Sequence, residues 1–454
     1  MTTKLRWMVL LLLMASALLA KENIFLVNYG PEQSIREGDD DFQQIIFIRL
    51  EASCTDSLYL RIFDADCGGE NDLAFGPWNT GVRFSLRGGA GAFSSPSLQM
   101  ATPTAADRDA GKELVTGLFG ENRELDNSWY NFAHFAPAEG EQVGAYRYFK
   151  LVVQGVSGND ANAFDLRVSS SPSMNITPAG AALFSCSPTL RLRKSENVAS
   201  ITFMVPETAR SITVNNFDLA GAVVQLVTPF RSNLPLLSSG QGEWAKTLLS
   251  LEPLEAGHPC AIVLGQGSES PNDVSLYISD DQGTILPIAL PVYLSKLNRR
   301  PLIQKSLIAL SDCHSIVFDA KDSTDPDGDL LEFRWDFGDG TTATGSRVAH
   351  LFPEQTTYQA LLIVSDNSGE VGNSVYERFS VKVNKPPLAK AAADLITAPL
   401  KAVVLDGSAS SDQDGRLTAF NWTFGDGHSA AGSKTTHAYE RPGTYTATLR
   451  IEDD

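Results

Sequence analysis

Short runs in which apolar and polar side chains alternate recur along most of the chain, separated by Gly, Pro, Asn and Asp. A period of two residues is typical of a β-strand that buries one face, and the separating residues favour turns. We therefore expect an all-β protein made of tandem β-sandwich domains. The clearest runs are residues 42–50, 58–63, 82–86, 146–153, 164–168, 190–193, 201–205, 211–214, 223–227, 261–264 and 274–278.

One strand pattern occurs twice. Phe333, Trp335 and Phe337 alternate with polar residues before a Gly-Asp-Gly turn, and residues 420–427 repeat the pattern 87 positions later. The same offset relates aspartate, histidine and aromatic residues on both sides of the pattern without a gap. Two copies of one domain are therefore predicted, over residues 299–384 and 386–454, each with its tryptophan in the core.

These motifs resemble the PKD (polycystic kidney disease) domain, an immunoglobulin-like β-sandwich with the signature W-D-F-G-D-G, then H-x-Y and P-G-T-Y. The second copy reproduces the signature in residues 422–427, 437–439 and 442–445. The first copy has His350-Leu-Phe352 and lacks the Pro-Gly turn before Tyr358. The resemblance covers residues 301–454 and implies the fold of that part alone.

Each copy also has an acidic turn ahead of its signature strand. In calcium-binding members of the PKD family, two carboxylates of this turn and one from the end of a later strand bind the ion, which takes six to eight oxygen ligands. The alternative is that turns simply favour aspartate and glycine. Carried over by position, the resemblance implies Asp325, Asp327 and Asp366 in the first copy and Asp412, Asp414 and Asp453 in the second.

The first copy continues after Asp366 with a strand-like run at residues 378–383, whose counterpart would lie beyond residue 454. We therefore expect the second copy to lack its last strand. We interpret the chain as a fragment of a longer protein. The alternative is a sandwich with an unpaired edge, which favours aggregation.

The first twenty residues have the pattern of a secretory signal peptide. Lys4 and Arg6 precede the apolar run 9–14, and small residues follow as far as Ala20. The apolar run is too short for a membrane span, no cysteine marks a lipoprotein cleavage site, and no later run is long enough to cross a bilayer. We therefore expect export to the periplasm, cell surface or medium, with no transmembrane segment after cleavage.

Two sandwich domains are predicted between the signal peptide and the repeats, over residues 21–170 and 180–297, both jelly-roll-like. The hairpin formed by residues 146–153 and 164–168 is similar to those of bacterial pre-peptidase accessory domains, which accompany secreted hydrolases. Residues 169–178 are a polar linker, and proline-containing joints at 298–301 and 384–387 precede the two copies. Such joints favour a semi-rigid arrangement.

Five cysteines suit an oxidising compartment. We predict disulfides between Cys54 and Cys67 and between Cys186 and Cys260, which leaves Cys313 over. The alternative is buried free thiols, because spacing does not determine connectivity. No cysteine or histidine spacing typical of a zinc site is present.

A formal net charge of −18 argues against nucleic acid and anionic membranes as partners. The loop from Asp64 to Asp72 has alternating carboxylates, but Phe75 stands where an EF-hand requires glutamate. We interpret this loop, like residues 38–41, as solvated. Outside the repeats, the side chains with the shape to stack on sugar rings are Trp78, Trp129, Tyr130 and Trp244, although core packing is the commoner role.

No motif for catalysis is found: the chain lacks His-Glu-x-x-His, Gly-x-Ser-x-Gly and a phosphate-binding loop. His350 and His437 occupy the H-x-Y framework position. We therefore expect a non-catalytic exported protein whose PKD copies serve as spacers or bind protein or polysaccharide. The alternative is the N-terminal accessory region of a larger secreted hydrolase or of an OmpA-like envelope-anchored protein. An enzyme within residues 21–296 would require acids or histidines gathered in a pocket.

Overall fold

The computed structural model describes residues 24–33, 42–192, 198–265, 272–310, 314–391 and 393–454. The predicted signal peptide, the acidic residues 38–41 and Cys313 lie outside these ranges. The chain divides into two compact units, and the boundary between their main parts lies between Arg299 and Arg300. Nearly all of the regular structure in both units is β-strand, which confirms the predicted fold class.

The first unit contains two antiparallel sheets. In its described residues, the first sheet has eight strands in the spatial order β16 (Trp244–Ser250), β13 (Ser211–Phe217), β18 (Asn272–Asp280), β11 (Thr189–Leu192), β1 (Phe25–Tyr29), β9 (Ala161–Ser169), β3 (Leu58–Phe63) and β6 (Trp129–Phe135). The second, also counted over described residues, has twelve: β15 (Leu234–Pro235), β14 (Val223–Val227), β17 (Pro259–Gly265), β12 (Val198–Met204), β19 (Ile288–Leu290), β10 (Ala182–Ser185), β2 (Gln43–Glu51), β8 (Tyr146–Ser157), β4 (Gly81–Gly88) and β5 (Lys112–Phe119), with β20 (Tyr293–Ser295) beside β12 and β7 (Glu141–Val143) beside β8.

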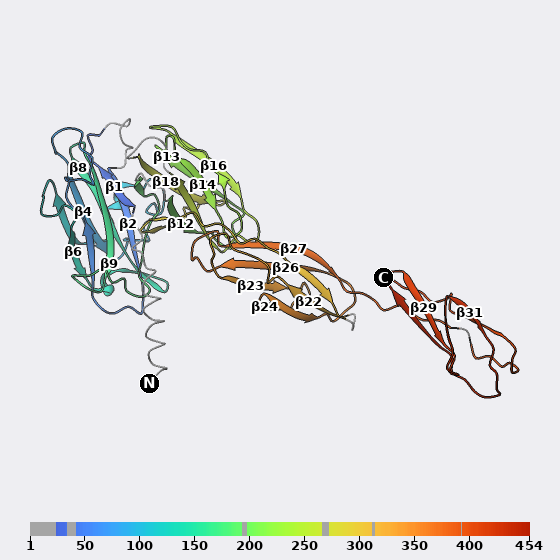
Figure 1. Ribbon diagram of the computed structural model, residues 1–454. Coiled ribbons are helices and arrows are strands. Elements are labelled where there is room, and N and C mark those ends of the chain that lie inside the picture. The colour runs from blue at the N-terminus through green and yellow to red at the C-terminus, as the bar shows by residue number, and fades with distance from the viewer. Residues whose placement is uncertain (1–23, 34–41, 193–197, 266–271, 311–313, 392) are drawn as a thin grey trace, which may run out of the picture. The chain divides into compact units, whose positions relative to one another are not determined.

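Both sheets cross the boundary that separates the two predicted sandwiches. Strand β1 lies between β9 and β11, and β10 lies between β2 and β19. The strands coloured blue and green in Figure 1 therefore belong to the same two sheets. One hydrophobic cluster extends from Ile24 to Leu294 between them. Residues 21–170 and 180–297 are thus not two separate sandwiches, because strands from each range complete the sheets of the other.

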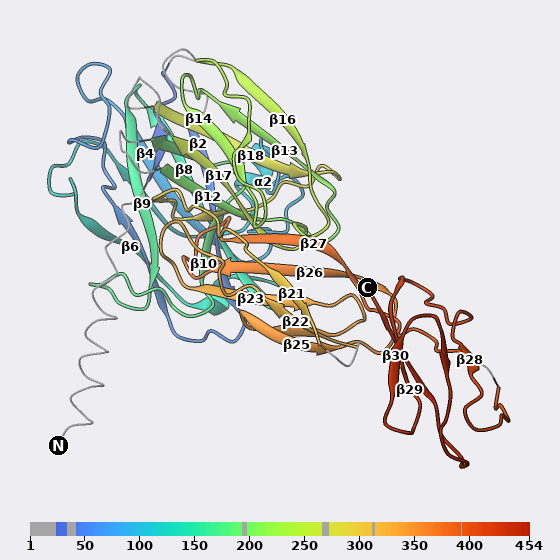
Figure 2. The same cartoon turned by 45° about the vertical axis from the view of Figure 1, so that its right-hand side comes forward.

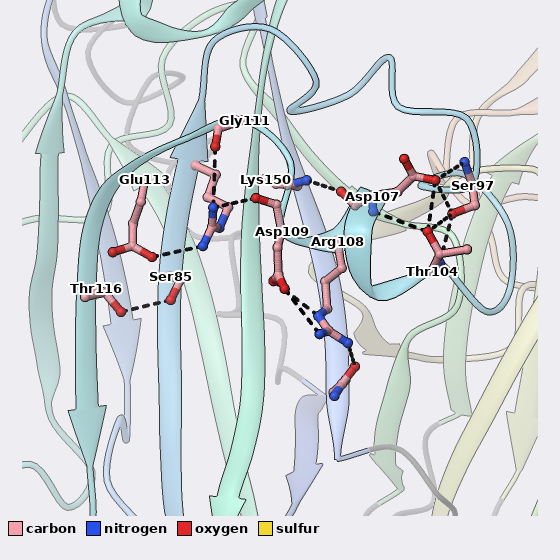
Figure 3. A network of polar contacts seen from close by, with 12 residues as sticks. Ser85, Ser97, Thr104, Asp107, Arg108, Asp109, Gly111, Glu113, Thr116 and Lys150 are labelled. Carbon is pink, nitrogen blue, oxygen red and sulfur yellow. Dashed lines mark hydrogen bonds and ion pairs between the residues drawn. The ribbon is translucent and has the colours of Figure 1, made fainter.

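The connection from β4 to β5 covers the outer face of the second sheet around Lys150. It contains the short helix α2 (Ala105–Arg108), while a 3-10 turn, η1 (Pro137–Glu139), follows β6. Lys150 is fully buried and its Nζ donates hydrogen bonds to the carbonyl oxygens of Asp107 (2.6 Å) and Gly91 (3.5 Å). Figure 3 shows Lys150 beneath this connection, where Asp107 also accepts from Ser97. The buried ammonium of Lys150 thus holds the β4–β5 connection against strand β8.

The burial of Lys150 predicts a change in stability with pH. Burial, with a smaller contribution from Arg87, lowers the pKa of Lys150 from 10.5 to about 8. The unfolded chain therefore holds this proton more tightly, so the free energy of unfolding should rise between about pH 8 and 10.5. The difference between the native protein and Lys150→Met in urea unfolding should be constant from pH 6 to 7.5 and then shift in favour of the native protein. A difference in unfolding free energy that stays constant up to pH 10.5 would contradict this account.

Neither predicted disulfide is present, because Cys54, Cys67, Cys186 and Cys260 are free thiols. Cys186 and Cys260 belong to different hydrophobic clusters, and Cys67 lies in the main core, where its Sγ accepts from Asn162 Nδ2 at 3.5 Å. Burial raises the pKa of Cys186 and Cys260 to about 12 and also raises that of Cys67. These three residues therefore behave as small apolar side chains, the alternative that the sequence left open.

The first repeat is defined as residues 299–384. One of its sheets has the order β21 (Ser306–Ala309), β22 (Ser315–Asp319) and β25 (Arg347–Leu351), and the other has β24 (Thr342–Thr344), β23 (Leu331–Asp336), β26 (Thr357–Asp366) and β27 (Ser374–Lys382). Figure 2 shows β26 and β27 side by side. Trp335 on the signature strand β23 is fully buried, and its Nε1 donates to Gly345 O at 2.9 Å. The predicted inward face of this strand is confirmed.

The second repeat is defined as residues 386–454. Its sheets are β28 (Val403–Asp406) with β31 (Lys434–His437), and β30 (Ser429–Ala431), β29 (Leu417–Thr423) and β32 (Thr448–Asp453). Trp422 is 1% exposed and donates to Gly432 O at 3.1 Å, the contact found in the first repeat. Among the residues described, β32 has no neighbour at the place that β27 takes beside β26. The described strands of the second repeat thus correspond to β22–β26 of the first, whereas the residues equivalent to β21 are not in a strand.

Candidate metal sites in the two repeats

A histidine and an aspartate form a partly buried corner in each repeat. His350 Nε2 lies 2.7 Å from Asp339 Oδ2, and its ring stacks on Phe337 with centroids 3.9 Å apart. His437 and Asp426 have the same 2.7 Å contact, with His437 stacked on Phe424. Burial opposes ionisation of Asp339, but hydrogen bonds from Thr341 and His350 keep its pKa below the usual range. Packing and pairing thus hold both histidines in the framework.

The acidic turn of the first repeat is closed by one oxygen of Asp325. Its Oδ1 accepts from the backbone N–H of Asp327 at 2.7 Å and of Asp329 at 3.2 Å. Its Oδ2 is buried and has no hydrogen-bond partner. A buried carboxylate oxygen without a donor is unfavourable unless a cation neutralises it. One oxygen of Asp325 therefore has a structural role and the other is available to an ion.

The remaining carboxylates predicted for the first repeat lie around the same turn. Burial raises the pKa of Asp329, and the charges of Asp325, Asp366 and Asp327 raise it further. Asp366 ends strand β26 opposite Leu331 and is 3% exposed, whereas Asp327 is exposed. The structure thus brings Asp325, Asp327 and Asp366 into one region of negative potential. Asp329 lies in the same region, although the resemblance to the PKD family does not imply it as a ligand.

The second repeat reproduces the essential feature of this turn. Asp412 Oδ1 accepts from Asp414 N at 3.1 Å, and Asp412 Oδ2 is buried without a partner, as in Asp325. A Cβ on Gly415 would lie 2.5 Å from Asp412 Oδ2 and 2.5 Å from Asp454 Oδ1. Both carboxylates therefore approach the same side of the backbone at Gly415, and a side chain there would displace them. Asp454 is a further acidic neighbour that the positional comparison omits.

The other two residues predicted for the second repeat contact the end of β27 and the joint that follows it. Asp453 Oδ2 accepts from Asn384 Nδ2 at 2.9 Å, and Asp414 Oδ2 lies 3.4 Å from Lys382 Nζ. Strand β29 has a bulge at Thr418, so Asp453 pairs with Leu417 in the register. The acidic turn is therefore tied to β27 and to the joint after it, and Asp454, like Asp412, lies beside Gly415.

A second group able to hold a metal lies at the histidine corner of the second repeat. Asp426, His428 and His437 each offer one ligand atom, and these atoms lie within 4.8 Å of one another. Thr341 occupies the position of His428 in the first repeat, so the group is specific to the second. His428 is exposed, and the close His437–Asp426 contact is shared by both repeats.

The aromatic candidates for sugar stacking mostly have partners. Trp129 packs on Phe63 at 5.4 Å, with the guanidinium groups of Arg61 and Arg167 over its ring. Trp244 is 51% exposed but lies against Phe217 and Tyr277. Trp244 is exposed, whereas Trp78 and Trp129 are only partly exposed.

Each of the two repeats is a small β-sandwich with a buried signature tryptophan and a His–Asp corner. Residues 298–381 and 384–454 match the PKD domain family. The two repeats are therefore PKD domains, and the predicted resemblance is confirmed.

Relatives match the chain over limited lengths. The pre-pro-metalloprotease PrtV of Vibrio cholerae is 30% identical over 139 residues, which is 30% of this chain and 15% of that protein. Collagenase ColA of Clostridium perfringens is 36% identical over 93 residues, 18% of this chain and 8% of that protein. The chain thus spans less than a sixth of the length of either relative. The crystal structure of the PKD1 domain of Vibrio anguillarum Epp is 23% identical, covers 19% of this chain and 96% of that one, and has a TM-score of 0.17.

No helix within the described residues is both long enough and apolar enough to cross a membrane.

Proposed function

We propose that this chain is a non-catalytic, exported β-sandwich protein whose PKD domains act as calcium-stiffened spacers and as surfaces for protein or polysaccharide contacts. The observation that carries the proposal is the repeated turn geometry. In both repeats one oxygen of the first turn aspartate closes the turn, and the other is buried without a donor beside further carboxylates. The acidic turns thus fit a hard cation with oxygen ligands.

The histidine corners support the non-catalytic part of this proposal. A general base must be able to reach a substrate proton, whereas His350 and His437 are paired with aspartates and stacked on phenylalanines. Their side chains are 14% and 13% exposed. These contacts stabilise the corner between the signature strand and the following hairpin.

A second candidate function is accessory to a secreted hydrolase. It is favoured by the similarity to PrtV and ColA, whose names describe a metalloprotease and a collagenase. Under this proposal the PKD domains position a catalytic region or its substrate. Determining the reading frame beyond the codon for Asp454 tests it, because a peptidase or glycosidase domain encoded there would favour the accessory role over the independent scaffold.

Calcium is expected to stabilise both PKD domains. At 100 times the dissociation constant, ligand binding adds about 2.7 kcal/mol to the free energy of unfolding, a rise of on the order of 10 °C for a domain of this size. Asp325→Ala with Asp327→Ala should abolish the calcium-induced rise of the first PKD domain and leave that of the second. Differential scanning calorimetry of the whole chain, with calcium and with chelator, measures both transitions.

Asp322→Asn is the matched control, because Asp322 is an exposed aspartate three residues before Asp325. It should retain the full calcium response. If calcium shifts neither PKD transition, the calcium part of the proposal is wrong. The proposed role as a spacer and contact surface would then stand without calcium.

A further inference from the structure

Two acidic loops meet at one end of the first unit. Residues 64–73 follow β3 and residues 120–128 precede β6, and these strands are paired through Phe63 and Trp129. Backbone hydrogen bonds join the loops, from Asp64 N to Ser128 O at 3.0 Å and from Cys67 N to Gly120 O at 3.3 Å. The β-sheet register therefore brings two loops together that are some 60 residues apart in sequence.

Three carboxylates converge between these loops. The ligand oxygens of Asp64, Asp66 and Asp126 lie within 4.8 Å of one another. Asp64 is 1% exposed and Asp66 is 0% exposed. The interpretation of residues 64–72 as a solvated loop is therefore wrong for its first two acids, which lie beneath the loop and not on its surface.

The hydrogen bonds of these acids are unequally distributed. Both oxygens of Asp64 accept hydrogen bonds, Oδ1 from Asn127 N at 3.2 Å and Oδ2 from Asn71 Nδ2 at 2.6 Å. Asp66 Oδ2 accepts from Asn122 N at 2.8 Å. Asp66 Oδ1 and Asp126 Oδ1 are buried and have no partner. Two buried oxygens left without donors in one acidic group require a cation or a proton to offset their desolvation.

The backbone of the first loop is shaped to pass over Asp126. A Cβ on Gly69 would lie 3.0 Å from Asp126 Cγ, and Gly69 has a φ of +85°, which L-residues rarely adopt. The neighbouring Gly68 approaches Asp66 Oδ2 and Asp126 Oδ1. The loop is anchored further along by Asp72, whose Oδ1 accepts from Ala163 N at 2.7 Å. The carboxylates are thus enclosed by ordered backbone.

The electrostatics of the group are unfavourable without a counter-charge. Burial raises the pKa of Asp66 to about 6, and the charges of Asp126 and Asp64 add to the effect. Burial also raises the pKa of Asp64, against the hydrogen bonds from Asn71 and Asn127. Three acids that repel one another at neutral pH are a common arrangement for binding a divalent cation.

We propose that Asp64, Asp66 and Asp126 bind a calcium ion that clamps the loop after β3 to the loop before β6. Calcium–oxygen distances of 2.3–2.6 Å place ligands of one ion up to about 5 Å apart, which the three oxygens satisfy, whereas magnesium requires a smaller octahedral set. The ion supplies the partner that Asp66 Oδ1 and Asp126 Oδ1 lack. It would hold edge strand β6 and the loops at its end in place, independently of the PKD domains.

Calorimetric titration of the whole chain with calcium tests the proposal. The PKD turns are first removed from the measurement by Asp325→Ala, Asp327→Ala, Asp412→Ala and Asp414→Ala. One binding event should remain, and Asp66→Asn should weaken it by about tenfold or more, because a charged ligand is lost. Asparagine keeps the shape of the side chain and an oxygen for Asn122 N. Exposed Asp56 provides the control, since Asp56→Asn should leave the binding event unchanged.

Terbium, which replaces calcium at oxygen sites, gives a second and local measurement. Trp129 directly follows the loop that contains Asp126 and packs on Phe63, the residue before Asp64. Excitation of tryptophan should therefore sensitise terbium emission in the PKD-disabled chain. Trp129→Phe should remove most of this emission while the calcium heat persists, and Asp126→Asn should remove both.

The outcomes separate this site from the PKD turns. If no calcium heat remains in the PKD-disabled chain, or if Asp66→Asn and Asp126→Asn both leave it intact, the proposed site does not exist and the group is held by a shared proton. Should Asp66→Asn fail to fold, Asp126→Asn decides, because Asp126 is only partly buried. If calcium binds at Asp64, Asp66 and Asp126 but shifts neither PKD transition of the unsubstituted chain, only the calcium part of the proposed function is wrong.

Discussion

Replacing Arg191 with methionine is expected to destabilise the first unit by about 3–5 kcal/mol, because it would leave a buried carboxylate without its counter-ion. Arg191 and Asp273 are 4% and 8% exposed and face each other across β11 and β18. Two hydrogen bonds join them, from Nε to Oδ1 at 2.8 Å and from the guanidinium to Oδ2 at 2.7 Å. Arg191 also donates to Asn71 O, and Tyr29 donates to Asp273. The pair therefore connects three strands and a loop.

The free energy is measured by denaturant unfolding of the first unit. A second variant, Arg191→Met with Asp273→Asn, should recover part of the loss because it removes the uncompensated charge. Arg83 is the control, since it is exposed on strand β4 of the same unit, and a surface substitution changes stability by at most about 0.5 kcal/mol. Equal effects of Arg191→Met and Arg83→Met would refute the assigned role of the buried pair.

Replacing Trp335 with alanine is expected to cost the first PKD domain about 3–5 kcal/mol, close to the whole stability of a small domain. The indole is fully buried, packs edge-on against Phe318 at 5.3 Å and donates its N–H to Gly345. Its loss leaves both a cavity and a carbonyl without a donor. Trp422→Ala should have the same effect on the second PKD domain, because Trp422 makes the equivalent contact with Gly432.

Each substitution should lower only the thermal transition of its own domain. The buried residues of the first PKD domain form a cluster of their own, from Ile316 to Val383. Trp244→Ala is the control, because this tryptophan is half exposed in the first unit. A loss of both PKD transitions on changing Trp335 alone would show that the two domains unfold together, which the separate core does not predict.

The repeats could be predicted from sequence because their information is local. The alternation around Trp335 identifies a strand, the Gly-Asp-Gly turn ends it, and the recurrence at Trp422 shows that the pattern belongs to a domain. The structure places both tryptophans in cores and both histidines at corners. Neither placement depends on contacts with distant parts of the chain.

The first unit was harder to predict because its pairings are not local. A polar linker at residues 169–178 looks like a domain boundary, yet β10, which follows it, pairs with β2 at Phe47 and Phe184. The cysteines mislead for a related reason: free thiols and disulfides have the same sequence signal, and only the fold shows, for example, that Cys186 and Cys260 lie in separate clusters. Strand alternation predicts the strands but not their neighbours.

The candidate sites show the same division. The turn aspartates Asp325 and Asp412 can be found by position, because the turn is short and closed by its own residues. The closeness of Asp126 to Asp64 and Asp66 could not be predicted from the sequence, because it depends on the pairing of β3 with β6. Alternating acids after a strand were the available signal, and burial, which sequence does not show, changes their interpretation.

The shared sheets of the first unit also affect the order in which the chain can acquire its structure. Strand β1 needs β11, and β10 needs β19 near residue 290, so neither sheet is complete until almost three hundred residues are available. Pairings over such sequence separations form slowly. A nascent chain therefore cannot complete either sheet of the first unit until the strands near residue 290 have been synthesised.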